Sequence, residues 1–196
     1  MTEQDSGTKE RLLQSGKEEF LQHGFQNASL RRICANAGVT TGALYFFFKN
    51  KEDLFGSIVG KPLAAYRELI ERSAKKEIED VSSATGNEEN LMRLLMTYRE
   101  EFILLLEKSA GTKYENCLTG YKANLEKVTA AFFEKYAPGK ANGRLIQLIV
   151  SMRVQGYLEI IHGNDTLEEA MKLAKYMSCY AEAGFSELTR QFNHEC

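Results

Sequence analysis

The stretch Ser29–Lys51, SLRRICANAGVTTGALYFFFKNK, decides the fold of the N-terminal part of the chain. It predicts two short helices separated by a tight turn at Ala37-Gly38-Val39. Gly38 can adopt the positive φ that such a turn requires. Ser29 and Thr40 are residue types that cap helix N-termini well. The pattern is that of a helix-turn-helix, whose second helix can enter a groove of DNA.

The charge distribution around this stretch supports the same interpretation. No Asp or Glu occurs from Phe20 to Lys51, although the whole chain has 27 acidic and 25 basic residues. A surface that meets phosphates cannot tolerate carboxylates. Residues 1–51 hold seven Lys or Arg and five Asp or Glu, so a mildly basic head precedes an acidic remainder. The small net charge of −2 therefore conceals a local footprint suited to nucleic acid.

The apolar periodicity along the rest of the chain predicts helices throughout. A first helix, Thr8–His23, should stop at Gly24, and a later one should start at Asn50, run past Ile70 and be interrupted and kinked by Gly60 and Pro62. The other expected elements are a helix Thr40–Phe48, a polar loop Ser82–Asn87, a helix Glu88–Lys108, a helix opened by the capping box Thr112/Glu115 and ending near Tyr136, a helix Asn142–His162, and a last helix opened by the capping box Thr166/Glu169 and ending near Phe192.

These elements predict an all-α protein of about nine helices. A three-helix helix-turn-helix DNA-binding head would occupy residues 1–55. A helical ligand-binding and dimerisation domain would occupy residues 56–196.

Several functional classes find no support in the sequence. The four cysteines are scattered, the three histidines form no metal or triad arrangement, and no phosphate-binding loop or nucleophile motif occurs. We therefore expect no catalytic residues, no metal, no cofactor and no enzymatic activity. The polar N-terminus is unlike a signal peptide, and the apolar runs are too short for a bilayer. These features favour a cytoplasmic protein without a membrane partner.

The N-terminal end of the second short helix is the candidate for base recognition. Threonine hydroxyls can meet phosphates or bases, threonine and alanine methyls can meet thymine methyls, and Gly42 allows a close backbone approach. These residues are Thr40, Thr41, Gly42 and Ala43, with Ser29 placed to face phosphate and with cations supplied by Arg31, Arg32, Lys49 and Lys51. A plain three-helix bundle is the alternative. The aromatic run Tyr45-Phe46-Phe47, which looks exposed, argues against it.

The chain resembles the TetR family of transcriptional regulators (TetR/AcrR type). The residues that carry the resemblance are Phe20-x-x-x-Gly24-Phe25, Ser29-Leu30-x-x-Ile33-Cys34-x-x-Ala37-Gly38-Val39, Gly42-x-Leu44-Tyr45-x-x-Phe48 and Asn50-Lys51-Glu52-Asp53-Leu54-Phe55. The match spans roughly Thr8 to Ile58. Beyond it, the resemblance is limited to the number and length of helices.

The resemblance implies that the head contacts DNA through specific residues. The family's contact positions fall on Ser29, Thr40, Thr41, Gly42, Ala43, Tyr45, Phe46 and Lys51, with Tyr45 and Lys51 on phosphates. The family often has tyrosine at the position of Phe46 and histidine at that of Phe47, and both of those are hydrogen-bond donors. This chain would replace phosphate contacts there with apolar contacts to sugars and thymine methyls.

The resemblance also implies a homodimer formed through the last two helices and a body that binds a small molecule. The wide apolar arc of the helix Asn142–His162 is consistent with a partner subunit, but also with a central helix in a monomer. Candidate effector residues are Tyr98, Phe102, Tyr121 and Arg153. For the aromatic residues, plain core packing is the alternative. For Arg153, an ion pair with Glu100, Glu101 or Glu182 is favoured over an anionic effector.

Together these observations predict a ligand-responsive DNA-binding regulator. In this interpretation it is a repressor that binds a palindromic operator as a homodimer and is released by an unknown small-molecule effector. Release would be a population shift, in which the helix containing Gly60 and Pro62 moves the two heads away from their half-sites. The alternative is a helical small-molecule-binding protein with weak or lost DNA binding. The sequence does not identify the operator, the effector or the regulated genes.

Overall fold

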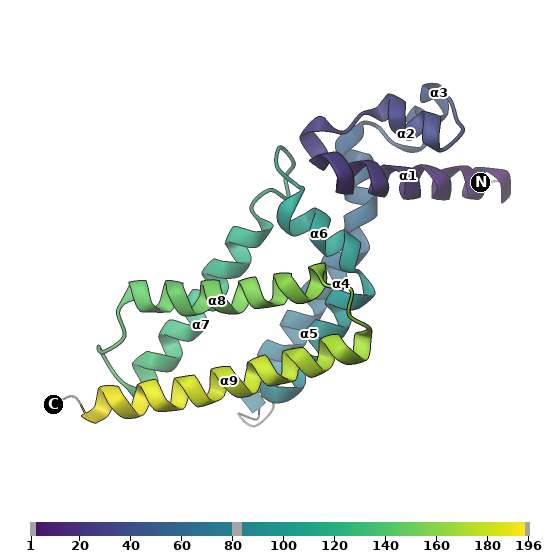
Figure 1. Cartoon of the computed structure of the whole chain (residues 1–196). Coiled ribbons are helices and arrows are strands. Elements are labelled where there is room, and N and C mark those ends of the chain that lie inside the picture. The colour runs from purple at the N-terminus through teal and green to yellow at the C-terminus, as the bar shows by residue number, and fades with distance from the viewer. Residues whose placement is uncertain (1–2, 80–83, 195–196) are drawn as a thin grey trace. The chain divides into compact units, whose positions relative to one another are not determined.

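The computed structural model describes residues 3–79 and 84–194, with side chains for 5–72 and 89–194. The described residues form nine α-helices and no strand, so the all-α prediction is confirmed (Figure 1). The helices are α1 (Glu3–Asn27), α2 (Leu30–Asn36), α3 (Thr41–Phe47), α4 (Lys51–Glu79), α5 (Ala84–Thr97), α6 (Arg99–Glu107), α7 (Cys117–Tyr136), α8 (Gly143–His162) and α9 (Leu167–His194).

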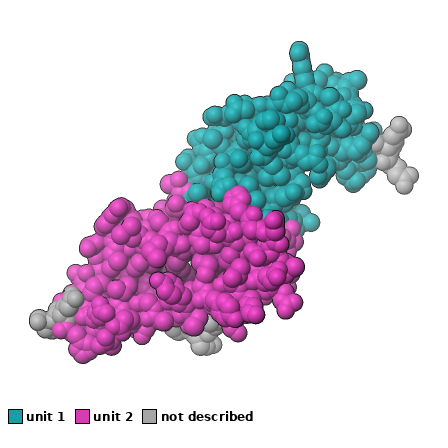
Figure 2. Space-filling model, viewed as in Figure 1, with its two compact units in different colours: residues 1–68, 98–118 teal, residues 69–97, 119–196 magenta. Residues whose placement is uncertain are grey.

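The chain divides into two compact units (Figure 2). The first unit comprises residues 1–68 and 98–118, and so contains α1, α2, α3, the first part of α4, and α6. The second unit comprises residues 69–97 and 119–196, with α5, α8, α9 and nearly all of α7. These two units are defined by packing. The predicted boundary between residues 55 and 56 separates a DNA-binding head from a ligand-binding domain by function, and it stays a prediction.

The core of the first unit is built around α1, which packs against α2, α3 and α6. Leu12, Phe20, Leu44 and Phe55 are fully buried, and the ring centroids of Phe20 and Phe55 lie 5.1 Å apart, edge to face. Burying side chains of this size stabilises a fold by about 1.5–3 kcal/mol each. The short helices α2 and α3 therefore depend on α1 and α4 for their stability.

A charged cluster ties α6 to α1 within the first unit. The ammonium of Lys17 lies 2.7 Å from Glu100 and 3.4 Å from Glu101. Burial alone would lower the pKa of Lys17, but the hydrogen bond and charge of Glu100, with those of Glu101, raise the pKa above its usual value. Glu100 and Glu101, which were expected as possible partners of Arg153, thus pair with Lys17.

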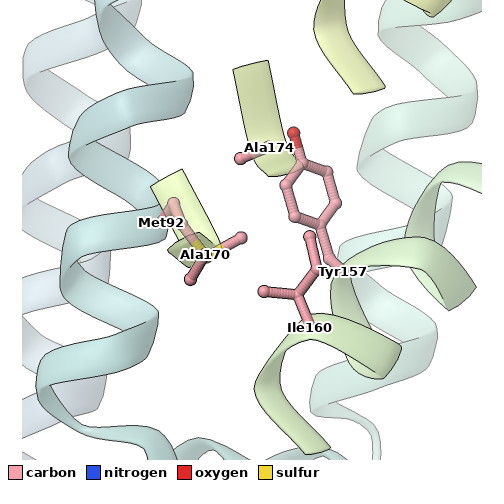
Figure 3. Packing of buried hydrophobic residues seen from close by; sticks show 5 residues of the cluster. All are labelled: Met92, Tyr157, Ile160, Ala170 and Ala174. Atoms are coloured by element: carbon pink, nitrogen blue, oxygen red, sulfur yellow. The ribbon is translucent and has the colours of Figure 1, made fainter. Parts of the chain in front are cut away.

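The second unit has a compact core where three helices meet (Figure 3). Met92 from α5, Tyr157 and Ile160 from α8, and Ala170 and Ala174 from α9 pack together. The two alanines leave room for the larger side chains of α5 and α8. The small side chain of Ala174 allows the helices to approach closely inside this core.

The first helix begins at Glu3 and not at Thr8, and three further expected helix boundaries were wrong. α4 runs unbroken through Gly60 and Pro62. Pro62 is buried, and a proline removes one backbone hydrogen bond, which a long packed helix can lose without ending. The expected helix over residues 88–108 is instead two helices, because Tyr98 leaves the helical region at φ −120° and ψ 40°.

The third of these further boundaries concerns the start of α7. Its first residue is Cys117, because Thr112 and Glu115 do not form a capping box. The hydroxyl of Thr112 donates to the Ser109 carbonyl, and the Glu115 carboxylate accepts from the backbone N–H of Gly111, so both serve a loop. Part of the expected polar loop is also helical, since α5 begins at Ala84, while residues 82 and 83 lie outside the described residues.

None of the helices formed by the described residues has both the length and the apolar run needed to cross a membrane.

Candidate nucleic-acid interface

The turn between α2 and α3 has the geometry that the sequence predicts. Gly38 has φ +66°, and the backbone N–H of Val39 donates to the Cys34 carbonyl at 2.9 Å. Below the turn, the buried hydroxyl of Ser15 on α1 donates to the Ile33 carbonyl at 2.9 Å. The buried side chains of Ile33, Cys34 and Leu44 complete the attachment. The two short helices are therefore fixed to α1 through both apolar and polar contacts.

Both helices carry the N-caps that the sequence predicts. The Ser29 hydroxyl accepts from the backbone N–H of Arg32 at 3.4 Å, and the Thr40 hydroxyl accepts from that of Ala43 at 3.2 Å. A hydroxyl that accepts one hydrogen bond still has a proton to donate. Both side chains can therefore donate to a phosphate or a base while they cap their helices.

The outer face of α3 is exposed and largely apolar. Phe46 is 73% exposed and Tyr45 is 58% exposed, while Phe47 is partly buried and touches Phe46 edge to face at a centroid distance of 5.0 Å. A Cβ added at Gly42 would meet only the Thr40 hydroxyl, at 3.7 Å. The other candidate contact residues on this side are Thr40 and Thr41, which are exposed, and Ala43, which is partly exposed.

A buried carboxylate on α1 holds the start of α2. Glu19, 4% exposed, accepts hydrogen bonds from the Arg32 guanidinium (Nη2 at 2.6 Å) and from the backbone N–H of Ser29 at 2.7 Å. Burial alone would raise the pKa of Glu19, but the hydrogen bonds from Arg32 and Ser29 and the positive charges of Arg32 and His23 lower the pKa below its ordinary value. Arg32 is thus committed to Glu19, whereas Arg31 is exposed on α2.

Lys51 has a structural role besides the one predicted for it. Its ammonium donates to the carbonyls of Gln26 and Ala28, each at 3.1 Å, and lies 4.7 Å from the centroid of the Phe25 ring. Burial lowers the pKa of Lys51, and the charge of Glu19 acts against this. An ammonium has three protons, so one is left for a phosphate.

The four candidate effector residues are divided between the two units. Tyr98 and Phe102 belong to the first unit, where Phe102 is buried against Tyr66 at a ring distance of 6.4 Å. Tyr121 and Arg153 belong to the second unit.

Arg153 lies in a groove of about 620 Å³ between α8 and α9. Most of the groove is apolar, and residues from both helices line it, among them Met152, Tyr180, Ala183 and Gly184. Met152 is 62% exposed and Tyr180 is 73% exposed. This face of α8 and α9 is thus open and apolar in one protomer.

The sequence interpretation missed two positioning features. Glu19 lies on the same face of α1 as the apolar residues Leu12 and Phe20. An acidic residue on an apolar face indicates a buried ion pair, so the sequence could have predicted one here. Gly156 was also missed: a Cβ there would lie 3.0 Å from the sulfur of Met177, so its hydrogen lets α8 and α9 approach closely.

The capped short helices, the glycine turn and the exposed face of α3 define a helix-turn-helix protein. Residues 12–58 match the family model described as bacterial regulatory proteins, tetR family. The head of the chain is thus similar to that of bacterial regulatory proteins of the tetR family, and the family model covers only this head.

Individual relatives agree with this assignment. The chain is 37% identical over 68 residues to the HTH-type transcriptional repressor BepR of Brucella suis. This alignment covers 35% of this chain and 32% of BepR. It is 24% identical over 171 residues to the HTH-type transcriptional regulator AcrR of Shigella flexneri, covering 78% of this chain and 77% of AcrR. The alignments with BepR and with UidR of Escherichia coli, another regulator, span only about a third of those proteins.

The fold extends the similarity beyond the head. A transcriptional regulator from Aquifex aeolicus VF5 superposes with a TM-score of 0.58 at 28% identity, covering 88% of this chain and 99% of that one. The structural similarity thus includes the helices that follow the head.

Proposed function

We propose that this chain is a transcriptional repressor that binds a palindromic DNA operator as a homodimer and leaves it when a small-molecule effector binds. The observation that carries the proposal is the outer face of α3, which is exposed, free of carboxylates and held rigidly by α1. Operator binding would place its activity in the cytoplasm, where bacterial DNA is found.

The DNA contacts of the proposal come from the two short helices and the start of α4. The hydroxyls of Ser29 and Thr40 keep a proton to donate, and Tyr45 exposes its phenol. Arg31 and Lys51 would contact phosphates, with Lys51 using its remaining proton. Thr41, Gly42, Ala43 and Phe46 would face base edges and sugars.

The proposed dimer forms through the groove between α8 and α9. Its exposed apolar side chains would leave water on dimerisation. Gly184 has no side chain and the space at its Cβ position is open, so a helix of the partner could approach α9 closely there. Two half-sites about one DNA turn apart could then be bound together. The position of Arg153 in this groove favours a role at the dimer interface over one in an effector pocket.

The effector part of the proposal rests on the family. Tyr98 and Phe102 in the first unit, and Tyr121 in the second unit, remain separate proposed aromatic contacts for a small molecule. A panel of metabolites and drugs, added to a preformed protein–DNA complex, would identify a ligand as one that lowers the affinity for DNA.

The decisive experiment is the binding of a fluorescently labelled duplex from the chain's own upstream promoter, measured by anisotropy at several salt concentrations. We expect specific binding that weakens steeply with salt, because phosphate contacts release counterions. Binding no tighter than that of a scrambled duplex would favour the alternative, a helical small-molecule-binding protein with weak or lost DNA affinity.

The variant Tyr45→Phe tests the geometry of the proposal at one atom. It removes the exposed hydroxyl and leaves the ring, so it should weaken operator binding about threefold to tenfold, the usual worth of one hydrogen bond. Tyr136→Phe, the same change on α7 at a 44% exposed tyrosine, is the matched control and should bind normally. Equal affinities for the two variants would contradict the predicted phosphate contact.

A further inference from the structure

The outer face of α3 lacks the side-chain types that most often bind base edges in a recognition helix. Bidentate contacts to guanine come from Arg or Lys, and those to adenine come from Asn or Gln. From Thr40 to Phe48 the chain contains none of these four residue types. What α3 and its cap present instead are hydroxyls, methyl groups and aromatic rings.

The nearby cations lie outside α3 and are partly committed elsewhere. Arg32 pairs with Glu19, and Lys51 donates to the carbonyls of Gln26 and Ala28. Arg31 lies on α2, and Lys49 follows the end of α3. These positions suit backbone phosphates, which carry no sequence information directly. Base discrimination in the major groove therefore depends on the apolar side chains of α3.

Phe46 is the dominant group on this face. It is 73% exposed, and its ring rests edge to face on Phe47, which is partly buried and lies next to the fully buried Phe48. The contact with Phe47 restrains the ring before DNA arrives, which lowers the entropy lost on binding. Ala43 and Thr41 add methyl groups near the N-terminal end of the same helix.

An apolar face of this kind discriminates between base pairs. Thymine alone carries a methyl group in the major groove, whereas guanine and cytosine present acceptors and a donor there. A phenyl ring against either base pair desolvates polar groups without offering a hydrogen bond, but only thymine offers a methyl group that offsets this cost. Against thymine, the same ring buries a methyl group.

We propose, on the basis of the proposed operator binding, that α3 recognises a half-site rich in A·T pairs by packing Phe46, with Ala43 and Thr41, against thymine methyl groups. The ligand class is a duplex whose central half-site positions carry thymine. Hydroxyls of Thr40 and Thr41 complete the contact without selecting a base strongly. The specificity of the head is therefore steric and apolar.

Replacing thymine by deoxyuridine tests the inference because it removes the methyl group alone. The 196-residue chain would first select its duplexes from a randomised pool, and the best duplex would then be synthesised with deoxyuridine at each half-site thymine in turn. Each contacted methyl should contribute about fourfold to affinity, the worth of one buried methylene-sized group. A duplex with deoxyuridine outside the half-sites is the control, and its affinity for the protein should equal that of the unmodified duplex.

A double-mutant cycle assigns the contact to its side chain. In Phe46→Ala, the loss caused by deoxyuridine at the contacted position should shrink to less than about twofold, because its partner is missing. Val128→Ala on α7, which also truncates an exposed apolar residue, should keep the full loss. The exposure of Phe46 means that its truncation leaves the core of the head intact.

The outcomes separate this inference from the function on which it rests. Tight, specific binding that is insensitive to deoxyuridine, or selected half-sites rich in G·C, would overturn the inference and leave the repressor proposal standing. Failure to select any duplex would overturn both. Selected A·T-rich half-sites whose affinity depends on both thymine methyls and Phe46 would support both.

Discussion

Glu19 shows how one buried residue can position a recognition surface that it does not belong to. Its carboxylate binds the Arg32 side chain and the Ser29 backbone N–H, and so fixes the first turn of α2. The acid-free stretch of sequence begins one residue after it. The head thus keeps a carboxylate close to the side proposed to face phosphates, but buried and paired with Arg32.

Replacing this carboxylate by an amide should destabilise the head. Glu19→Gln removes the negative charge and replaces one of the two acceptor oxygens by an NH2 group, so we expect a loss of about 2 kcal/mol in the free energy of unfolding at pH 7. Urea denaturation followed by circular dichroism measures it. Glu18→Gln, on the exposed side of the same helix, is the control and should change stability by less than about 0.5 kcal/mol.

The same pair should make this difference depend on pH. The pKa of Glu19 is lower in the folded state than in the unfolded state, where it is about 4.3. Its stabilising contribution is therefore complete above the unfolded pKa and is lost as the pH falls through the folded pKa. The gap between the wild type and Glu19→Gln should be constant from pH 7 to 5 and narrow below about pH 4. A gap that widens on acidification would contradict the pairing.

At the residue scale, the sequence predicted the exposure of Tyr45 and Phe46 correctly, but it was wrong for Phe47, which is partly buried, and it missed the buried polar contacts. The exposure of Tyr45 and Phe46 was predictable, because neither fits the apolar spacing of Leu44 and Phe48. The pairing of Glu19 with Arg32 depends on contacts between helices that a one-dimensional pattern does not contain.

Helix ends in this chain follow local chemistry where a side chain can cap its own helix. The caps at Ser29 and Thr40 and the reciprocal pair Thr166/Glu169 were confirmed, and Asn142 caps α8 as well. The break at Tyr98 was not foreseen. Just before it, the hydroxyl of Thr97 donates to the Arg93 carbonyl at 2.7 Å, a contact that often bends helices.

The sharpest test at the scale of an element is the kink at Gly24 inside α1, where the sequence predicted that the helix would stop. Gly24 has φ +69° and ψ 165°, a region that is open essentially only to glycine. Gly24→Ala should therefore cost about 1–3 kcal/mol, although the nearest atom to its Cβ, the Lys108 carbonyl oxygen, would lie 4.0 Å away. The free energy of unfolding by urea measures the cost.

Gly7→Ala provides the matched comparison in the same helix. Gly7 is exposed, has nothing within 4 Å of its Cβ position and does not have a positive φ, so alanine should stabilise α1 by up to about 1 kcal/mol. Opposite signs for the two substitutions would show that backbone conformation, and not space, makes Gly24 necessary. Two changes of the same sign would refute that explanation.

At the scale of the whole molecule, the number of helices and the position of the head were predictable from periodicity and caps. The assignment of α6 to the first unit was not. It follows from the packing of α6 on α1, which includes the ion pairs of Lys17 with Glu100 and Glu101, more than eighty residues away in sequence. Pairs this far apart in sequence cannot be predicted from the local hydrophobic periodicity or from helix caps.

The proposed dimer can be tested without disturbing the protomer. An arginine at position 184 would project a charge into the α8–α9 groove, where the Cβ position of Gly184 is open. Gly184→Arg should therefore fold normally by circular dichroism, elute as a monomer in light-scattering chromatography and bind the operator at least tenfold more weakly, because avidity is lost.

Gly120→Arg is the control for this substitution. Gly120 is an exposed glycine of α7 whose Cβ position is equally open, so the variant should remain a dimer. If Gly184→Arg also remained dimeric, the α8–α9 groove would not be the interface.

The open groove between α8 and α9 has a consequence for gene dosage. With the groove as the proposed interface, the species that silences a promoter is made from two copies of the chain. At low copy number its amount grows as the square of the protomer concentration. Halving the protomer concentration would then reduce the concentration of the silencing species about fourfold. Silencing would therefore begin over a narrow range of protomer concentration, and the dissociation constant of the dimer would set that range.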